Sequence, residues 1–281
     1  SGADDYSVTA GELKTGYTKF EDAESLDVNL ILGGPGGGAG DTASDQDTHV
    51  TMITDLVEKR RDCVGFVSPY RAATVNVTST ITQTSNVKDA FDDCPSSSYM
   101  VFDSAYKYMY DKYNDVFRFV PLNGDTAGLC AFTDQVRDAW FSPAGFNRGR
   151  IRGAIKLSYN PNKAERDRLY RARVNPVVNF AGQGVTLFGD KTALSFASAF
   201  DRINVRRLFL FIERSVRDSV NWAVFQPNNN QTRENLKNSI AAFLFRCYNM
   251  GMLDGDSWAD SFTVQCDKEN NPEADIRSGL L

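Results

Sequence analysis

The sequence is short of the residues that build most enzyme active sites. It contains a single histidine, His49, and five widely spaced cysteines that form no Cys-x-x-Cys pair. A histidine-based nucleophile relay and a cysteine zinc site are therefore not indicated. No Gly-x-Ser-x-Gly motif marks an activated serine. We expect no catalytic residue, no cofactor and no metal ion, and we expect that the protein is not an enzyme.

Long apolar runs and an excess of basic residues are missing as well. The run Ala241–Phe245 falls far short of the ~20 residues that a membrane helix needs. A formal net charge of −5, with acidic and basic residues interspersed, argues against a nucleic-acid partner. No secretory leader opens the chain, and we interpret Ser1 as the boundary of a fragment. The odd number of cysteines favours free thiols in a reducing compartment.

What is present indicates a globular α/β chain, with 42% hydrophobic residues. Thr9 and Glu12 have the spacing of a capping box at the start of a helix that runs through Phe20. The apolar run Leu26–Leu32 predicts a strand buried on both faces. Helical spacing through Val50, Ile53, Leu56 and Val57 and a second strand at Cys63–Val67 complete a β-α-β unit.

The rest of the chain alternates between helices, strands and polar loops. Residues 70–98 are rich in Thr, Ser, Asn and Asp and predict a surface excursion with a short helix at Val87–Phe91. Apolar spacing along Ile203–Val220 predicts a helix with Val205, Leu208, Phe209, Ile212 and Val216 on one face. The other expected elements are strands at Tyr99–Phe102, Ile151–Leu157 and Trp258–Cys266, helices at Pro121–Val136, Pro161–Arg173 and Thr232–Met250, and a hairpin that joins Val177–Phe180 to Val185–Phe188.

The glycine-rich stretch Gly33–Gly40 offers the main alternative, a nucleotide-binding loop between strand and helix. No Gly-Lys-Ser/Thr ending follows, and Pro35 removes a backbone donor. Asp41, Asp45 and Asp47 place negative charge where an anion would bind. We therefore interpret the stretch as a flexible surface loop.

Two other groups of residues suggest chemistry less strongly. Asp45, Asp47 and His49 match no metal-ligand spacing, so His49 is expected to be a partly exposed helix residue. Tyr106, Tyr108, Tyr110 and Tyr113 could stack on bases, but they alternate with Lys and Asp side chains. Cross-strand packing or a protein interface is the better interpretation of these tyrosines.

Several segments, in order, resemble the tail sheath family of contractile-tailed phages, particularly its T-even-like branch. The most specific of them is Phe200–Phe209, with the sequence FDRINVRRLF. The others are Thr9–Leu13, Glu24–Leu30, Glu58–Cys63, Tyr106–Val116, Val120–Leu122, Ala127–Ala131, Ser142–Gly149, Gly189–Thr192, Val264–Asp267 and Asn270-Asn271.

The resemblance implies a structural subunit that polymerises as hexameric rings around a tail tube and contracts to drive the tube through the host envelope. Its partners would be neighbouring sheath subunits, the tail tube protein, and baseplate and neck proteins, without nucleic acid or membrane. It would reside in the virion, and in the host cytoplasm during assembly. Arg202, Arg206, Arg207 and Lys237 are the candidates for assembly or tube contacts.

In fold, the resemblance implies α/β architecture: a subtilisin-like domain with a mixed sheet and flanking helices over residues 1–178, then an α+β C-terminal sheath domain over residues 179–281. The family's terminal arms, outer domains and last strand have no counterpart here, so we expect a core fragment. A sheath subunit of a related injection machine, such as a tailocin or a secretion system, is the runner-up interpretation. A nucleotide-binding α/β protein is the less favoured alternative.

Overall fold

A computed structural model describes residues 8–36, 41–267 and 269–272 of the chain. The chain divides into two compact units, Ser1–Arg207 and Leu208–Leu281, here called the N-terminal and C-terminal units. Helices and strands alternate through the N-terminal unit, which confirms the predicted α/β class. The predicted domain boundary at 178/179 lies inside a β-hairpin and stays a prediction.

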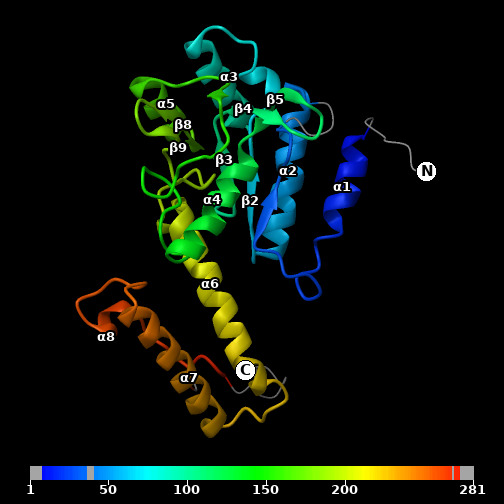
Figure 1. Ribbon diagram of the computed structural model, residues 1–281. Helices are drawn as coiled ribbons and strands as arrows, with labels where there is room; N and C mark the ends of the chain where they lie inside the picture. The colour runs from blue at the N-terminus through cyan, green and yellow to red at the C-terminus, as the bar shows by residue number, and fades with distance from the viewer. Residues whose placement is uncertain (1–7, 37–40, 268, 273–281) are drawn as a thin grey trace. The chain divides into compact units, whose positions relative to one another are not determined.

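The central sheet of the N-terminal unit has four parallel strands in the order β1-β2-β3-β7. Figure 1 shows β2 between helices α2 and α4. A Cβ at Gly65 of β2 would lie 2.6 Å from the Met100 sulfur and 3.0 Å from Ile53, so α2 can approach the sheet closely there. The elements are β1 (Leu30–Leu32), α2 (Ala43–Arg60), β2 (Val64–Val67), β3 (Met100–Asp103), α4 (Asn123–Val136) and β7 (Val174–Asn175). The predicted β-α-β unit is confirmed.

The first strand differs from its prediction in length and in burial. β1 is confined to Leu30–Leu32, and Leu32 is exposed because β1 is the edge strand of the sheet. Helix α1 (Ala10–Thr18), which begins with the predicted Thr9/Glu12 capping box, lies beside it. The Tyr17 hydroxyl donates to Leu32 O at 2.7 Å, which satisfies an acceptor on this edge strand.

The polar segment 70–98 is mostly built into the fold, so the prediction of a surface excursion is wrong. Helix α3 (Thr80–Asp92) is much longer than the predicted turn of helix, and it follows the short 3-10 helix η1 (Arg71–Ala73). Gln83 is buried and donates to Thr74 O at 2.7 Å and Val77 O at 2.9 Å. Buried polar side chains with hydrogen-bond partners break the apolar spacing that would have revealed this helix.

Two antiparallel arrangements complete the N-terminal unit. The sheet β5-β4-β6 brings Tyr108 4.8 Å from Phe119 and 5.7 Å from Phe117, which confirms the predicted cross-strand packing of the aromatic stretch. The predicted strand Ile151–Leu157 is wrong except for its last two residues, because Gly153 adopts a positive φ of 71°. The elements are β4 (Tyr106–Asp111), β5 (Val116–Pro121), β6 (Lys156–Leu157), α5 (Lys163–Arg171) and the predicted hairpin β8 (Val177–Phe180) with β9 (Gly184–Leu187).

Helices dominate the described part of the C-terminal unit. Helix α6 (Ile203–Val220) begins in the N-terminal unit and continues across the division, followed by η3 (Asn221–Ala223), α7 (Asn230–Asn249) and α8 (Trp258–Ser261). On α6, Leu208 is 9% exposed but Phe209 is 38% exposed. The predicted apolar face is therefore wrong for Phe209, because adjacent helical residues point about 100° apart.

The predicted strand Trp258–Cys266 is also wrong. Residues 258–261 form helix α8, and residues 262–266 pair with no strand among the described residues. Phe262, Val264 and Cys266 alternate as in a strand, but a strand also requires a partner that supplies its hydrogen bonds.

All five cysteines are free, and their burial predicts an order of chemical reactivity. Cys63, Cys94, Cys130 and Cys247 are buried, whereas Cys266 is half-buried. Burial raises the pKa of Cys63 and of Cys94 to about 12, so little of the reactive thiolate forms near pH 8. We expect iodoacetamide to modify Cys266 first in the native protein and the other four only after unfolding, as followed by mass spectrometry. Fast native modification of two or more thiols would contradict this burial pattern.

Candidate functional site

Three of the four candidate residues lie together at the beginning of α6, and the fourth lies elsewhere. Arg202 directly precedes the helix, and Arg206 and Arg207 occupy its first turns. Lys237 is half-buried on α7 in the C-terminal unit. The site described below, the α6 junction, comprises Asp190–Arg207 and the side chains that hold this segment.

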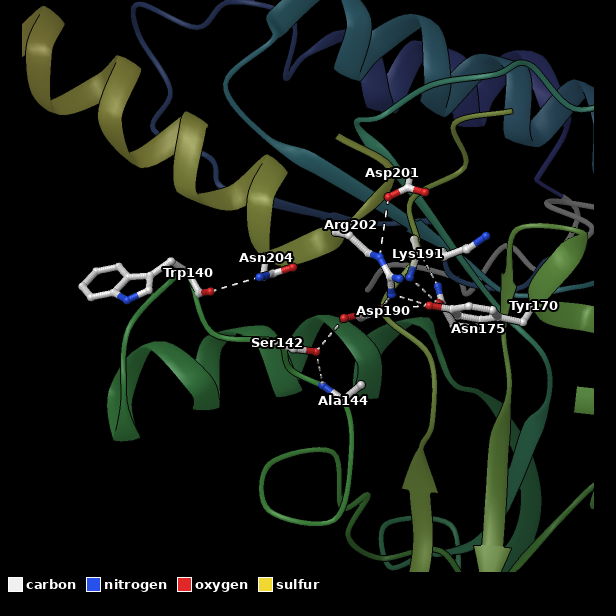
Figure 2. Close-up of polar contacts among 10 residues, drawn as sticks. All are labelled: Trp140, Ser142, Ala144, Tyr170, Asn175, Asp190, Lys191, Asp201, Arg202 and Asn204. Atoms are coloured by element: carbon white, nitrogen blue, oxygen red, sulfur yellow. Dashed lines mark hydrogen bonds and ion pairs between the residues drawn. The ribbon is translucent and has the colours of Figure 1, made fainter. Parts of the chain in front are cut away.

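Arg202 is fixed by an acidic and a phenolic partner (Figure 2). Its Nη1 lies 2.5 Å from Asp190 Oδ1, and the same nitrogen donates to the Tyr170 hydroxyl. The Tyr170 hydroxyl donates in turn to Asp190 Oδ1 at 3.1 Å. The hydrogen bond to Asp190 raises the pKa of Arg202, so the guanidinium stays charged. Burial and then the Asp190 charge raise the pKa of Tyr170 to about 12, so its hydroxyl remains a donor.

Asp190 connects this arginine to the rest of the N-terminal unit. Its second oxygen accepts a hydrogen bond of 3.1 Å from the hydroxyl of Ser142, in the loop that follows α4. Its backbone oxygen accepts the N–H of Ile203 at 2.8 Å, which positions the first residue of α6. Figure 2 shows Asn204 reaching the same loop, where its side-chain amide donates to Trp140 O at 3.2 Å. The start of α6 is thus tied to segments 60 residues and more apart in sequence.

Asn175 holds the strand-like segment that leads into this junction. Its Nδ2 donates to Phe102 O at 3.0 Å and to Lys191 O at 2.8 Å, while its Oδ1 accepts the N–H of Lys191 at 2.7 Å. The Lys191 ammonium lies 4.7 Å from the centre of the Tyr170 ring. These contacts couple the junction to the parallel sheet through β3 and β7.

Arg206 is a buried cation held by aromatic rings. It is 7% exposed, and its guanidinium carbon lies 4.3 Å from the Tyr99 ring centre and 4.0 Å from that of Phe200. Its Nη2 donates to the Ser98 hydroxyl at 2.7 Å. Desolvated cation–π contacts contribute about 2 kcal/mol, so these contacts attach α6 to the segment before β3.

Arg207 is held by an ion pair and a hydrogen bond. It is 8% exposed; its Nη2 lies 2.5 Å from Asp134 Oδ2, and its Nη1 donates to Cys130 O at 3.4 Å. Both partners belong to α4. The three arginines therefore attach the start of α6 to three separate segments of the N-terminal unit.

The glycine loop and His49 are structural, contrary to two expectations. Residues 37–40 lie outside the described residues, but Gly36 is buried: its N–H donates to the Tyr106 hydroxyl at 3.4 Å. A Cβ on Gly36 would lie 2.1 Å from Ser68 O, so this part is not a flexible surface loop. His49 is buried rather than partly exposed, and its Nε2 lies 2.7 Å from Gly33 O. Burial lowers the pKa of His49.

Polar residues at the carboxyl edge of the sheet are occupied with one another. The Ser68 hydroxyl donates to Asp103 Oδ2 at 2.7 Å and accepts two hydrogen bonds from Asn123, at 2.9 and 3.1 Å. Since His49 contacts Gly33 instead, Ser68, His49 and Asp103 do not form a relay. Among the described residues, no group of three metal-ligating side chains occurs. In the same residues, no helix is long and apolar enough to cross a membrane.

Sequence reasoning missed Arg60, whose side chain is 0% exposed. It lies in the last turn of α2. A basic residue in the last turn of a helix is common, so burial of this guanidinium carries no sequence signal.

The arrangement of elements is that of contractile sheaths. The chain superimposes on the contracted sheath complex of an extracellular contractile injection system, PVC, with a TM-score of 0.74 over 94% of this chain and 68% of that chain, at 21% identity. At this identity the likeness concerns the fold alone.

Sequence comparison then gives the family. Residues 7–193 match the phage tail sheath protein central domain, and residues 196–280 match the phage tail sheath C-terminal domain. The chain therefore belongs to the phage tail sheath protein family. It is 42% identical to the tail sheath protein of Vibrio phage KVP40 over 96% of this chain, and 41% identical to that of Enterobacteria phage T4 over 94%. It spans about two fifths of the length of these relatives, 41% and 40% respectively.

Proposed function

We propose that this chain is the core of a sheath subunit that polymerises as hexameric rings around a phage tail tube. On contraction the rings slide and rotate, which drives the tube through the host envelope. The observation that carries the proposal is the ordered match to both sheath domains, together with 41–42% identity to two phage tail sheath proteins. The subunit resides in the virion tail and assembles in the host cytoplasm.

The function is mechanical and not enzymatic. The polar groups at the carboxyl edge of the sheet, where α/β enzymes bind ligands, are joined by the Ser68–Asp103–Asn123 hydrogen bonds instead. Partners are neighbouring sheath subunits, the tail tube protein, and baseplate and neck proteins at the sheath ends. A subunit with this role must bear load without unfolding, and the anchored start of α6 supports that requirement.

The four candidate residues divide between support and contact. Arg206 and Arg207 are buried and hold α6 from within, whereas the side chain of Arg202 is 44% exposed and Lys237 is half-buried. Arg202 and Lys237 are accordingly the better candidates for contacts with a neighbouring subunit or the tube. Exposed ion pairs contribute only about 0–1 kcal/mol each, so such contacts can exchange during contraction.

The proposal is tested by cryo-electron microscopy of the whole gene product that carries this chain, expressed alone. Helical tubes with six subunits per ring are the expected result. Replacing Lys237 by alanine should reduce tube formation while thermal unfolding stays unchanged, with Lys163→Ala as the matched surface control. A folded whole protein that forms no rings or tubes at any ionic strength would contradict the function.

A second candidate is a sheath subunit of a cellular injection machine. The fold likeness to the PVC sheath complex supports it. The 41–42% identity to phage sheath proteins favours the phage tail. Genes for a capsid and a terminase beside this one would support the phage tail, and their absence from a complete cluster would support the injection machine.

A further inference from the structure

The N-terminal unit contains a cavity of about 850 Å³. Arg148, Arg150 and Arg152 line it. The Ile151 N–H donates to Val185 O at 2.9 Å, so this segment runs alongside β9. Residues two apart in an extended segment point to the same side, so Arg150 and Arg152 share a side and the intervening Ile151 is buried. Arg148 lies in the preceding turn, where its Nε donates to Ser142 O at 2.7 Å. The backbone thus directs the Arg150 and Arg152 side chains to one cavity, and Arg148 also lines it.

The positive charge of the cavity is not balanced within the described part of the chain. The acidic lining residue Asp125 is already paired with Lys107, at 2.8 Å. Arg150 and Arg152 have no carboxylate within ion-pair distance among the described residues. The Arg152 guanidinium lies 5.4 Å from the Phe132 ring centre, which orients it at the cavity wall. Grouped cations of this kind attract an anionic partner.

Helix α4 leaves room for that partner. Gly124 and Gly128 lie four residues apart on it and both line the cavity. A Cβ on either would meet nothing within 4 Å. Glycine inside a helix is less stable than alanine by about 1 kcal/mol, so neither packing nor helix formation accounts for these glycines. The absence of side chains at these two positions leaves open space where α4 lines the cavity.

An acidic segment of the chain itself has matching properties. Asp254, Asp256 and Asp260 are exposed in the C-terminal unit and form no ion pair within the structure that is described. Trp258 lies among them with 54% exposure. An indole can stack on a guanidinium or on a phenyl ring, and the aspartates carry the charge that complements Arg150 and Arg152.

We infer that the arginine cavity of one copy binds the acidic segment 254–260 of a second copy. Donor and acceptor surfaces differ, so the contact is head-to-tail and extends into an open polymer. The inference rests on the proposed sheath function, because only a polymer makes such a contact useful. Neighbouring subunits would then bind one another through exchangeable ion pairs between these two surfaces.

Two reversed variants of the 281-residue chain test this pairing, by light scattering over a concentration series at low and high salt. One is Arg150→Glu/Arg152→Glu, and the other is Asp254→Lys/Asp256→Lys. Wild-type chain should self-associate weakly at low salt, and each variant alone should lose at least tenfold in association constant. An equimolar mixture should regain association, because each reversed surface then meets its complement. Gly128→Met should block the wild-type contact by filling the cavity, whereas Gly128→Ala should not.

Controls separate this contact from general charge effects and from the sheath function. The variant Lys14→Glu/Lys163→Glu changes the net charge by the same amount as Arg150→Glu/Arg152→Glu and should associate like wild type. Three results would each overturn the inference: wild type does not self-associate, both reversed variants still associate, or the mixture of the two variants does not associate. The last outcome would indicate a contact within one chain. Tubes formed by the whole gene product despite such a result would leave the proposed function standing.

Discussion

Replacing Arg60 with alanine is expected to destabilise the N-terminal unit by about 3–5 kcal/mol. Its fully buried guanidinium donates to three backbone oxygens: Phe20 O at 2.5 Å, Asp22 O at 3.1 Å and Leu26 O at 2.8 Å. It also pairs with Asp62, through Nε at 2.9 Å and Nη2 at 2.8 Å. Truncation leaves these acceptors without a donor and detaches the segment that joins α1 to β1.

The measurement is urea unfolding followed by circular dichroism. Arg60→Lys should recover only part of the loss, because one ammonium group cannot reproduce the planar fork of donors. Lys59→Ala is the neighbouring control: Lys59 pairs with Glu21 at the surface, and such pairs contribute about 0–1 kcal/mol. If Arg60→Ala and Lys59→Ala were equally mild, the buried network would not hold this segment.

Local sequence signals predicted the elements whose stability is local. The Thr9/Glu12 capping box, the β8–β9 hairpin and the α6 range Ile203–Val220 all matched, because each depends on neighbours a few residues apart. The β1 strand was overextended because sequence does not reveal which strand lies at a sheet edge. Alternation at Phe262–Cys266 predicted a strand for which the described residues provide no partner.

The α6 junction could be predicted only in part for a related reason. Arg202, Arg206 and Arg207 stand out because they belong to Phe200–Phe209, the segment that resembles sheath sequences most specifically. Their partners Asp190, Tyr170 and Ser142 lie in separate segments without a shared spacing. Hydrogen bonds between distant segments depend on the tertiary fold, so only the resemblance of Gly189–Thr192 and Ser142–Gly149 to sheath sequences pointed to two of them.

A carboxyl group in the core makes the stability of the N-terminal unit depend on pH. Asp103 ends β3 and is 1% exposed. Burial raises its pKa to about 8, although hydrogen bonds from the Ser68 hydroxyl and the Ala105 N–H favour the carboxylate. The nearby charge of Asp125 raises it further. At neutral pH the folded protein therefore holds a protonated Asp103, which an unfolded chain would release.

The sign of the effect follows from that difference in proton binding. Below the ordinary aspartate pKa, Asp103 is protonated in both the folded and the unfolded state, and its contribution to the free energy of unfolding is fully present. Between that value and about 8 the unfolded state loses the proton first, so the free energy of unfolding falls by up to about 1.4 kcal/mol per pH unit. Above pH 8 the loss levels off. Buried His49, whose pKa is lowered, acts in the opposite direction as pH rises through its ordinary titration range.

Comparing wild type with Asp103→Asn isolates the carboxyl group, because the His49 contribution is common to both proteins. Asparagine is the neutral isostere of a protonated aspartate, so the stability of the Asp103→Asn variant should not depend on titration at this position. Urea unfolding at intervals from pH 5 to pH 9 should show wild type losing stability relative to the variant, by on the order of 3–4 kcal/mol up to pH 8. Ser68→Ala removes a hydrogen-bond donor that favours the Asp103 carboxylate. In this variant the free energy of unfolding should fall more steeply with pH near pH 8 than it does in wild type. A constant difference between wild type and Asp103→Asn across the range would mean that Asp103 titrates as an ordinary carboxyl group.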